Sequence, residues 1–71
     1  MKKIEFIEDG YEIVVTIPNK ADSPIIEADA YYKDFENYRI LILADSEEKA
    51  VKIALKELLT NHPFEQIIRN L

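Results

Sequence analysis

The sequence predicts a single α+β domain in which a four-stranded, mainly antiparallel sheet is followed by one long and one short helix. Residues 1–44 alternate apolar and polar side chains in short runs separated by turn residues, which is typical of strands. Residues 45–71 place apolar side chains three and four positions apart, which is typical of amphipathic helices. We therefore expect the order β-β-β-β-α-α over residues 1–71, with the long helix packed on one face of the sheet.

The first two strands are expected to form a hairpin. Residues 3–8 and 11–17 both have strand character, and Asp9-Gly10 separates them. An Asp-Gly pair between two such runs favours a two-residue turn, because the turn requires positive φ angles that these residues tolerate. Pro18 ends the second strand, since proline cannot donate a hydrogen bond to a neighbouring strand.

Two further strands are expected over residues 25–32 and 38–44, joined by a loop at residues 33–37. In the third strand even-numbered positions face inward and odd-numbered positions face outward. The run from Ile40 to Leu43 is apolar on both faces, which favours a central position in the sheet.

The helical half begins at Asp45, which we expect to be the N-cap of the long helix, with Glu48 completing a capping box. An apolar stripe follows at i, i+3, i+4 and i+7, formed by Val51, Ala54, Leu55 and Leu58. Asn61 and Pro63 end this helix, and Pro63 starts a shorter one. The second stripe consists of Phe64, Ile67, Ile68 and Leu71.

The composition excludes several classes of protein. The chain has no Cys, which excludes disulfides and thiolate metal sites and favours a reducing cytoplasm. The basic pair Lys2-Lys3 is not followed by the apolar run of a signal peptide. No stretch approaches the roughly 18 apolar residues of a membrane span. We therefore expect a cytoplasmic protein that does not bind a membrane.

The net charge of −5 is spread unevenly along the chain. Residues 1–48 hold twelve acidic residues against five Lys or Arg, whereas residues 49–71 hold four Lys or Arg against two acidic residues. Direct binding to nucleic acid needs the opposite sign of charge on the binding face. The excess of acid either serves solubility or indicates a protein partner with a basic surface.

The sequence contains few residues of the types that catalysis requires. His62 is the only histidine, and a chain with one Gly cannot build a phosphate-binding glycine loop. Glu27 and Asp29 share a strand face about 7 Å apart, as in a glycosidase pair or a hard-metal site, although a solvated polar face is the preferred interpretation. We expect no enzymatic activity, metal or cofactor. A small metal protein or enzyme that uses Glu27, Asp29 and His62 stays as an alternative.

The outward face of the sheet is the expected partner-binding surface. It combines apolar and acidic side chains, and exposed apolar patches on small domains mark contact sites. Tyr31 is the expected anchor, because Tyr is enriched at interface hot spots. The C-terminal helix covering this face, or self-association into a homodimer through this face or an edge strand, are the alternatives. The expected contact residues are Glu5, Glu12, Val14, Glu27, Asp29, Tyr31, Asp34, Glu36 and Leu41.

Two segments resemble the domains of HicB-like antitoxins. Residues 8–18 contain an Asp9-Gly10 turn that leads into a strand ending in Pro18, and residues 44–58 open a helix with an Asp-Ser-x-Glu-x-Ala pattern that begins at Asp45. The resemblance implies a β-β-β-α fold and neutralisation of a small RNase toxin. The present chain has an additional hairpin between the two motifs.

A second resemblance concerns only the general type of protein and rests on no sequence motif. Small acidic α+β proteins without catalytic residues resemble the inhibitors of host defence that phages carry, such as anti-CRISPR and anti-restriction proteins. The function that we expect first is therefore that of an inhibitor or decoy, which occupies the basic nucleic-acid-binding site of a larger protein, such as a nucleic-acid enzyme. The alternative is an antitoxin whose partner is a small toxin.

Overall fold

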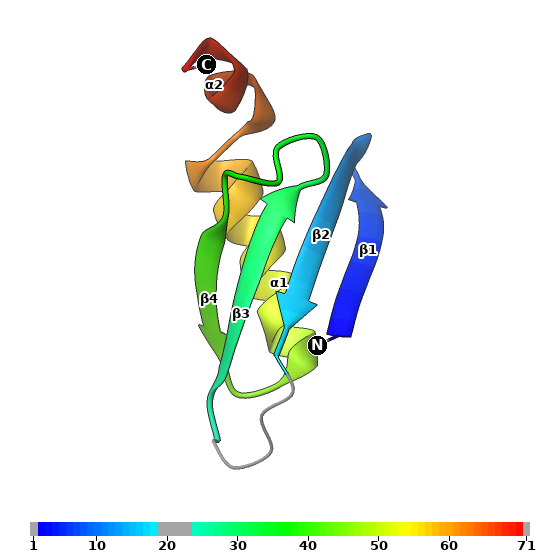
Figure 1. The fold of residues 1–71 in the computed structure, drawn as a ribbon, viewed down its shortest axis with the longest axis vertical. Coiled ribbons are helices and arrows are strands. Elements are labelled where there is room, and N and C mark those ends of the chain that lie inside the picture. The colour runs from blue at the N-terminus through cyan, green and yellow to red at the C-terminus, as the bar shows by residue number, and fades with distance from the viewer. Residues whose placement is uncertain (1, 19–23, 71) are drawn as a thin grey trace.

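The computed structural model describes residues 2–18 and 24–70 of the chain and has the predicted α+β fold. In Figure 1 the long helix crosses behind the sheet and the short helix lies beyond one end of it. The molecule is accordingly elongated, 39 Å by 19 Å by 18 Å. The elements in chain order are β1 (Lys2–Glu8), β2 (Tyr11–Ile17), β3 (Ile26–Tyr32), β4 (Ile40–Ala44), α1 (Glu47–Asn61) and α2 (Phe64–Arg69).

The sheet is an antiparallel meander with the strand order β1-β2-β3-β4. The predicted hairpin between β1 and β2 is confirmed, with Glu8 opposite Tyr11. Asp9 and Gly10 have φ angles of 53° and 83°. Two successive positive φ angles are what a type I′ turn requires, so the Asp-Gly pair fixes the register of the first two strands.

The prediction that β4 is a central strand is wrong, because β4 is an edge strand and β2 and β3 are the central ones. The inner-face side chain of Ile42 is buried in the core, as expected. Leu41 and Leu43 on the other face are exposed. Both faces of β4 are therefore apolar, but only the inner face is buried. An apolar run in the sequence does not distinguish such an edge strand from a central strand that is buried on both faces.

The core lies between one face of the sheet and α1. The helix stripe is centred on Ala50, Ala54 and Leu58, whereas the predicted Val51 and Leu55 are half-buried at its flanks. Both layers contribute alanines to this core, and such small side chains let the two layers pack closely. The buried residues of this core are Ile13, Val15, Ile17, Ala28, Ala30, Tyr32, Ile42, Ala44, Ala50, Ala54, Leu58 and Ile67.

The N-cap of α1 is Ser46 and not the predicted Asp45. Ser46 has an extended backbone, and its Oγ accepts a hydrogen bond from the Lys49 backbone N–H at 3.2 Å. The expected capping box with Glu48 is therefore not formed. The strand β4 ends at Ala44, as expected, but the helix begins one residue later than the pattern suggested, and the Ser46 hydroxyl takes the capping position.

The C-terminal helix α2 packs on the same side of the sheet as α1. The Phe64 ring contacts the rings of Tyr11, Tyr32 and Phe35, with centroid distances of 5.1 Å, 5.3 Å and 5.1 Å. Tyr11 and Tyr32 belong to the inner face, and Ile67 is buried beside them in the core. The alternative in which the C-terminal helix covers the outward face of the sheet is therefore wrong.

Candidate functional site

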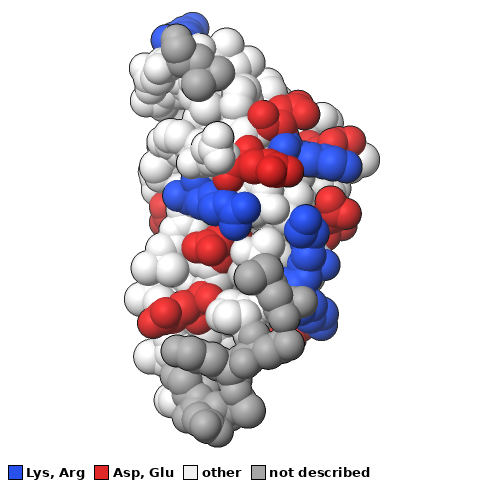
Figure 2. Space-filling view, viewed as in Figure 1, with Lys and Arg blue, Asp and Glu red and all other residues white. Residues whose placement is uncertain are grey.

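The face of the sheet that points away from α1 is called the outer face below. Strand alternation places on it Glu5 and Ile7 of β1, Glu12, Val14 and Thr16 of β2, Glu27, Asp29 and Tyr31 of β3, and Leu41 and Leu43 of β4. No described helix lies over these residues. Figure 2 looks onto the outer face and shows acidic and basic side chains interspersed with uncharged ones.

The apolar groups that reach the surface lie on the two edge strands. Ile7 of β1 is 68% exposed, and Leu41 and Leu43 of β4 are 65% and 55% exposed. The central strands contribute Val14 and Tyr31, each only 2% exposed. Of the predicted contact residues, Leu41 is therefore accessible to a partner, whereas Val14 and Tyr31 are covered by their neighbours.

Tyr31 is covered by an arginine. The Arg39 guanidinium carbon lies 4.4 Å from the centroid of the Tyr31 ring, which is a cation–π contact. The Nε of Arg39 also donates a hydrogen bond to the Glu36 carbonyl oxygen at 2.9 Å. A partner that used Tyr31 as an anchor would first have to displace Arg39, so Arg39 and not Tyr31 is presented to a partner.

The carboxylates of the outer face differ in their surroundings. Glu12 lies 3.9 Å from the Lys33 ammonium, a partly solvated ion pair. Glu5, Glu27 and Asp29 form no ion pair with any other described residue. Together with Lys33 and Arg39, the face is therefore a mixture of charges, in which three carboxylates keep their charge unpaired.

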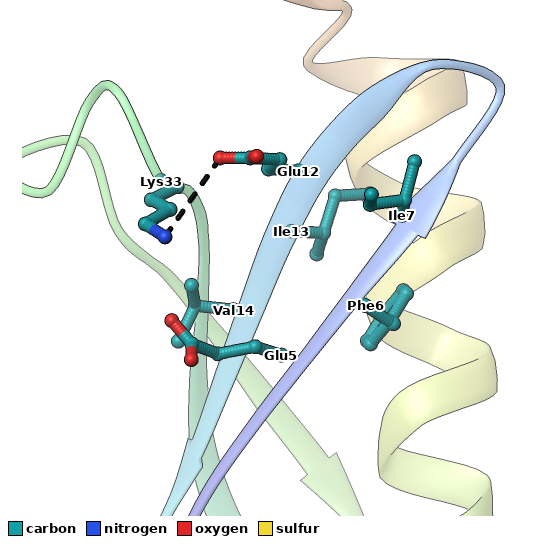
Figure 3. A pocket seen from close by; sticks show the side chains of 7 residues that line it. All are labelled: Glu5, Phe6, Ile7, Glu12, Ile13, Val14 and Lys33. Atoms are coloured by element: carbon teal, nitrogen blue, oxygen red, sulfur yellow. Dashed lines mark ion pairs between the residues drawn. The ribbon is translucent and has the colours of Figure 1, made fainter.

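A shallow pocket of about 410 Å³ opens between β1 and β2 on this face. Figure 3 shows Glu12 and Lys33 turned toward each other on one side of it, with Glu5 next to Val14 and with Ile7 nearby on β1. Glu5 and Val14 are direct cross-strand partners, as are Ile7 and Glu12. On the outer face, Val14 and Ile7 of the pocket lining thus each lie opposite a carboxylate. Sequence reasoning missed Lys33, which the backbone bond from Lys33 N–H to the Glu12 carbonyl oxygen positions at 3.0 Å.

Asp34 and Glu36 lie apart from the other predicted contact residues. Both belong to the loop between β3 and β4 and line a second hollow of about 320 Å³ between that loop and α2. Tyr38 lines the same hollow and is exposed. The structure therefore divides the predicted residues into a group on the outer face and a smaller group at the α2 end of the molecule.

The alternative metal or catalytic set is not brought together. His62 is the C-cap of α1, and its Nδ1 lies 3.0 Å from the Tyr38 hydroxyl. Glu27 and Asp29 lie on the outer face of β3 instead. Within residues 2–18 and 24–70 there is no group of three or more His, Asp or Glu side chains placed to hold a metal ion.

Among the same residues no helix has both the length and the apolar character to span a membrane.

Comparison of the chain with protein-family models, with curated proteins and with solved structures gave no significant match.

Proposed function

We propose that this chain is a non-enzymatic protein-binding module whose outer face contacts a basic surface on a larger protein. The observation that supports this most directly is the combination of exposed apolar side chains with unpaired carboxylates on a sheet face that no described helix covers. Apolar contact supplies affinity, and carboxylates select a partner of opposite charge.

Glu27 and Asp29 are the central acidic contacts of this proposal. They are two residues apart on β3, so their side chains project in the same direction about 7 Å apart. Neither is neutralised by another described residue, which leaves both available to Lys or Arg side chains of a partner. Arg39, which lies over the Tyr31 ring two residues along β3 from Asp29, repels a wrongly placed cation and so restricts the orientation in which a basic partner can bind.

The specific form that we propose is an inhibitor that occupies the nucleic-acid-binding site of its partner. A basic groove that binds phosphates offers the cations that the carboxylates of the outer face require. The same carboxylates, with a net charge of −5 for the chain, disfavour direct binding of nucleic acid. Binding of this chain and of nucleic acid to the partner would then be mutually exclusive.

The test is capture of proteins from host lysate on the immobilised chain, with a charge-reversed variant and a matched control. E27K/D29K reverses the two central carboxylates, and E48K/E65K reverses two exposed carboxylates on the helices. Both variants change the net charge equally. We expect the wild type and E48K/E65K to retain one nucleic-acid-binding protein that E27K/D29K does not retain. Salt and a DNA duplex should each release this protein from the wild type. Equal retention by both variants, or no release by DNA, would contradict the proposal.

A second candidate is an antitoxin-like module, which the exposed Leu41 and Leu43 favour. A partner held by these leucines would stay bound at high salt, because apolar contact is not screened. Its retention would be lost on replacing Leu41 by Gln and unaffected by E27K/D29K. Recovery of a small basic protein with this pattern would favour the antitoxin over the inhibitor.

A further inference from the structure

The two edges of the sheet differ in how they are protected. Four of the seven residues of β1 are charged, and charged side chains, Lys above all, discourage the addition of another strand. All five residues of β4, Ile40–Ala44, are apolar and none is Pro or Gly. Figure 1 shows β4 at the margin of the sheet with no described strand beyond it. An apolar edge of this kind is a template for pairing with another strand.

The sequence that surrounds β4 is complementary to itself. If a second copy pairs antiparallel with β4 about Ile42, residues whose numbers add to the same total lie opposite each other, and Arg39 then faces Asp45 of the other copy. The symmetry repeats this pair at the other end of the strand. Directly opposite side chains project from the same face with Cβ atoms about 5 Å apart, which is within reach of an ion pair.

The apolar residues of β4 match in the same register. Leu41 faces Leu43 of the other copy on the outer face, which joins the exposed leucines of both copies into one apolar strip. On the inner face Ile40 lies opposite Ala44, so a large side chain meets a small one. A hollow of about 340 Å³ opens beside Ala44 at the carboxyl end of β4, which leaves room for the larger partner.

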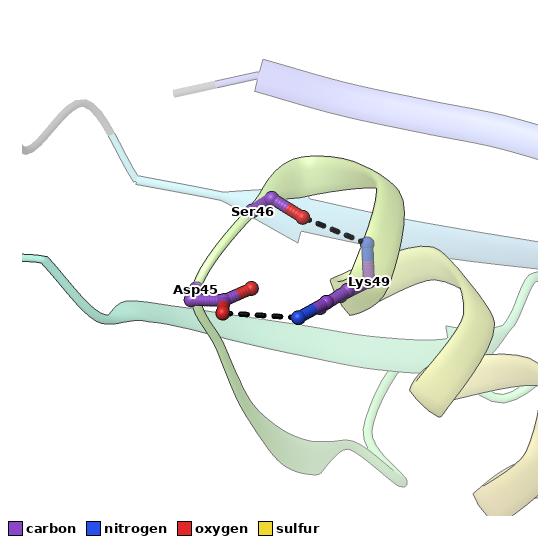
Figure 4. Close-up of polar contacts among 3 residues, drawn as sticks. All are labelled: Asp45, Ser46 and Lys49. Carbon is purple, nitrogen blue, oxygen red and sulfur yellow. Dashed lines mark hydrogen bonds and ion pairs between the residues drawn. The ribbon is translucent and has the colours of Figure 1, made fainter.

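The two charged groups keep bonding capacity for such a pair. Among the described residues the guanidinium of Arg39 pairs with no carboxylate, and its one hydrogen bond uses Nε. Asp45 binds the Lys49 ammonium through Oδ2 at 3.1 Å (Figure 4). The remaining guanidinium N–H groups of Arg39 are therefore donors at one end of the β4 edge. The Asp45 Oδ1 is an acceptor at the other end.

We propose that this chain forms a symmetric homodimer by antiparallel pairing of β4 with β4 of a second copy, in the register centred on Ile42 and closed at both ends by Arg39–Asp45 ion pairs. The dimer joins two four-stranded sheets into one and uses both open β4 edges, so it closes without forming a fibre. It leaves the carboxylates of the outer face accessible and does not depend on the function proposed above.

Charge reversal of either residue tests the register. R39D sets carboxylate against carboxylate at both ends of the junction, and D45R sets guanidinium against guanidinium. In sedimentation equilibrium we expect the wild type to dimerise and each variant to dimerise at least about tenfold more weakly, because like charges placed opposite each other are repulsive. Circular dichroism and urea unfolding of each variant establish that it is folded.

An equimolar mixture of R39D and D45R separates the proposal from a general loss of structure. In the mixed dimer each end again joins a carboxylate and a guanidinium, so two chains that dimerise poorly alone should associate with each other. Native mass spectrometry distinguishes this heterodimer from both homodimers by mass. A K3D variant, which makes the same change of charge at the protected β1 edge, should remain as dimeric as the wild type.

A cross-link provides a second measurement, should a charge-reversed variant be unfolded. The chain has no Cys, so L41C and L43C each introduce a single thiol at an exposed site. The register places these two positions opposite each other only when the two variants are mixed, and oxidation should then give far more linked dimer than either variant alone.

A wild type that is monomeric up to about 1 mM would overturn the proposal. Failure of the charge-reversed mixture to associate while both variants are folded, or no excess of linked dimer on mixing the Cys variants, would overturn it as well.

Discussion

Replacement of Tyr32 by Phe tests how the two helices are fixed to the sheet. The Tyr32 side chain is 1% exposed, and its hydroxyl donates to the carbonyl oxygens of Leu58 and His62 at 3.0 Å and 3.1 Å. The His62 N–H donates to the Glu57 carbonyl oxygen instead of that of Leu58. The hydroxyl therefore satisfies a carbonyl group at the end of α1 that the helix itself leaves open.

The expected loss follows from this geometry. One hydroxyl proton supplies about one hydrogen bond, and its removal leaves a sheltered carbonyl without its partner, so the free energy of unfolding should fall by about 1 to 2 kcal/mol. A chain of this length has a total stability of only about 4 to 10 kcal/mol. The melting temperature should therefore drop by at least about 4 °C. Urea unfolding at pH 7 measures the difference.

The pH dependence gives the same substitution a second readout. Burial is the main cause that raises the pKa of Tyr32 above its ordinary value of 10.0. Above that pH the unfolded chain loses the proton before the folded chain does, so the stability of the wild type falls as pH rises toward the raised pKa. The Phe variant lacks this contribution, and the stability difference between wild type and variant should shrink above pH 10.

Tyr38→Phe is the matched control for Tyr32→Phe. Its hydroxyl lies 3.0 Å from His62 Nδ1, but this contact is exposed, so removal should change the stability by less than about 0.5 kcal/mol. Equal effects of the two substitutions, or an unchanged stability in Tyr32→Phe, would refute the role given to the Tyr32 hydroxyl.

Two further substitutions test the local geometry of the turns and caps. Ser46→Ala should lower the stability by about 1 kcal/mol in urea unfolding, because the Oγ that caps α1 is lost. Asp45→Ala removes, within one chain, only an exposed ion pair and should cost less. A larger loss in Asp45→Ala than in Ser46→Ala would indicate that Asp45 is the N-cap. Gly10→Ala should cost about 1 kcal/mol by thermal unfolding, since its φ of 83° disfavours a Cβ although no other atom lies within 4 Å. Gly10→Asn should lose less, and an Asn variant as unstable as the Ala variant would contradict the conformational explanation.

The element order was predictable because its signals are local. The Asp9-Gly10 turn encodes its own backbone angles, and the helical spacing after Asp45 needs no knowledge of the rest of the chain. The start of α1 was predicted one residue early, because Asp45 and Ser46 are both good N-caps and the sequence pattern does not distinguish between them.

The arrangement of the elements was less predictable because it depends on contacts distant in sequence. The run around Leu41 has the composition of a central strand, and only the pairing of whole strands shows that it lies at the edge. The position of α2 is set by the contact of the Phe64 ring with those of Tyr11 and Tyr32, more than thirty residues away. The covering of Tyr31 by Arg39 likewise arises from a contact across a loop, which strand alternation alone does not reveal.

The meander order of the sheet also bears on how the chain folds. Every strand pairs with the strand that precedes or follows it in the sequence, so no pairing has to wait for a distant segment. Closing short segments costs little chain entropy, and proteins with many local contacts fold fast. The sheet can thus assemble hairpin by hairpin as the chain leaves the ribosome, with α1 emerging after the four strands to cover a face that is already formed.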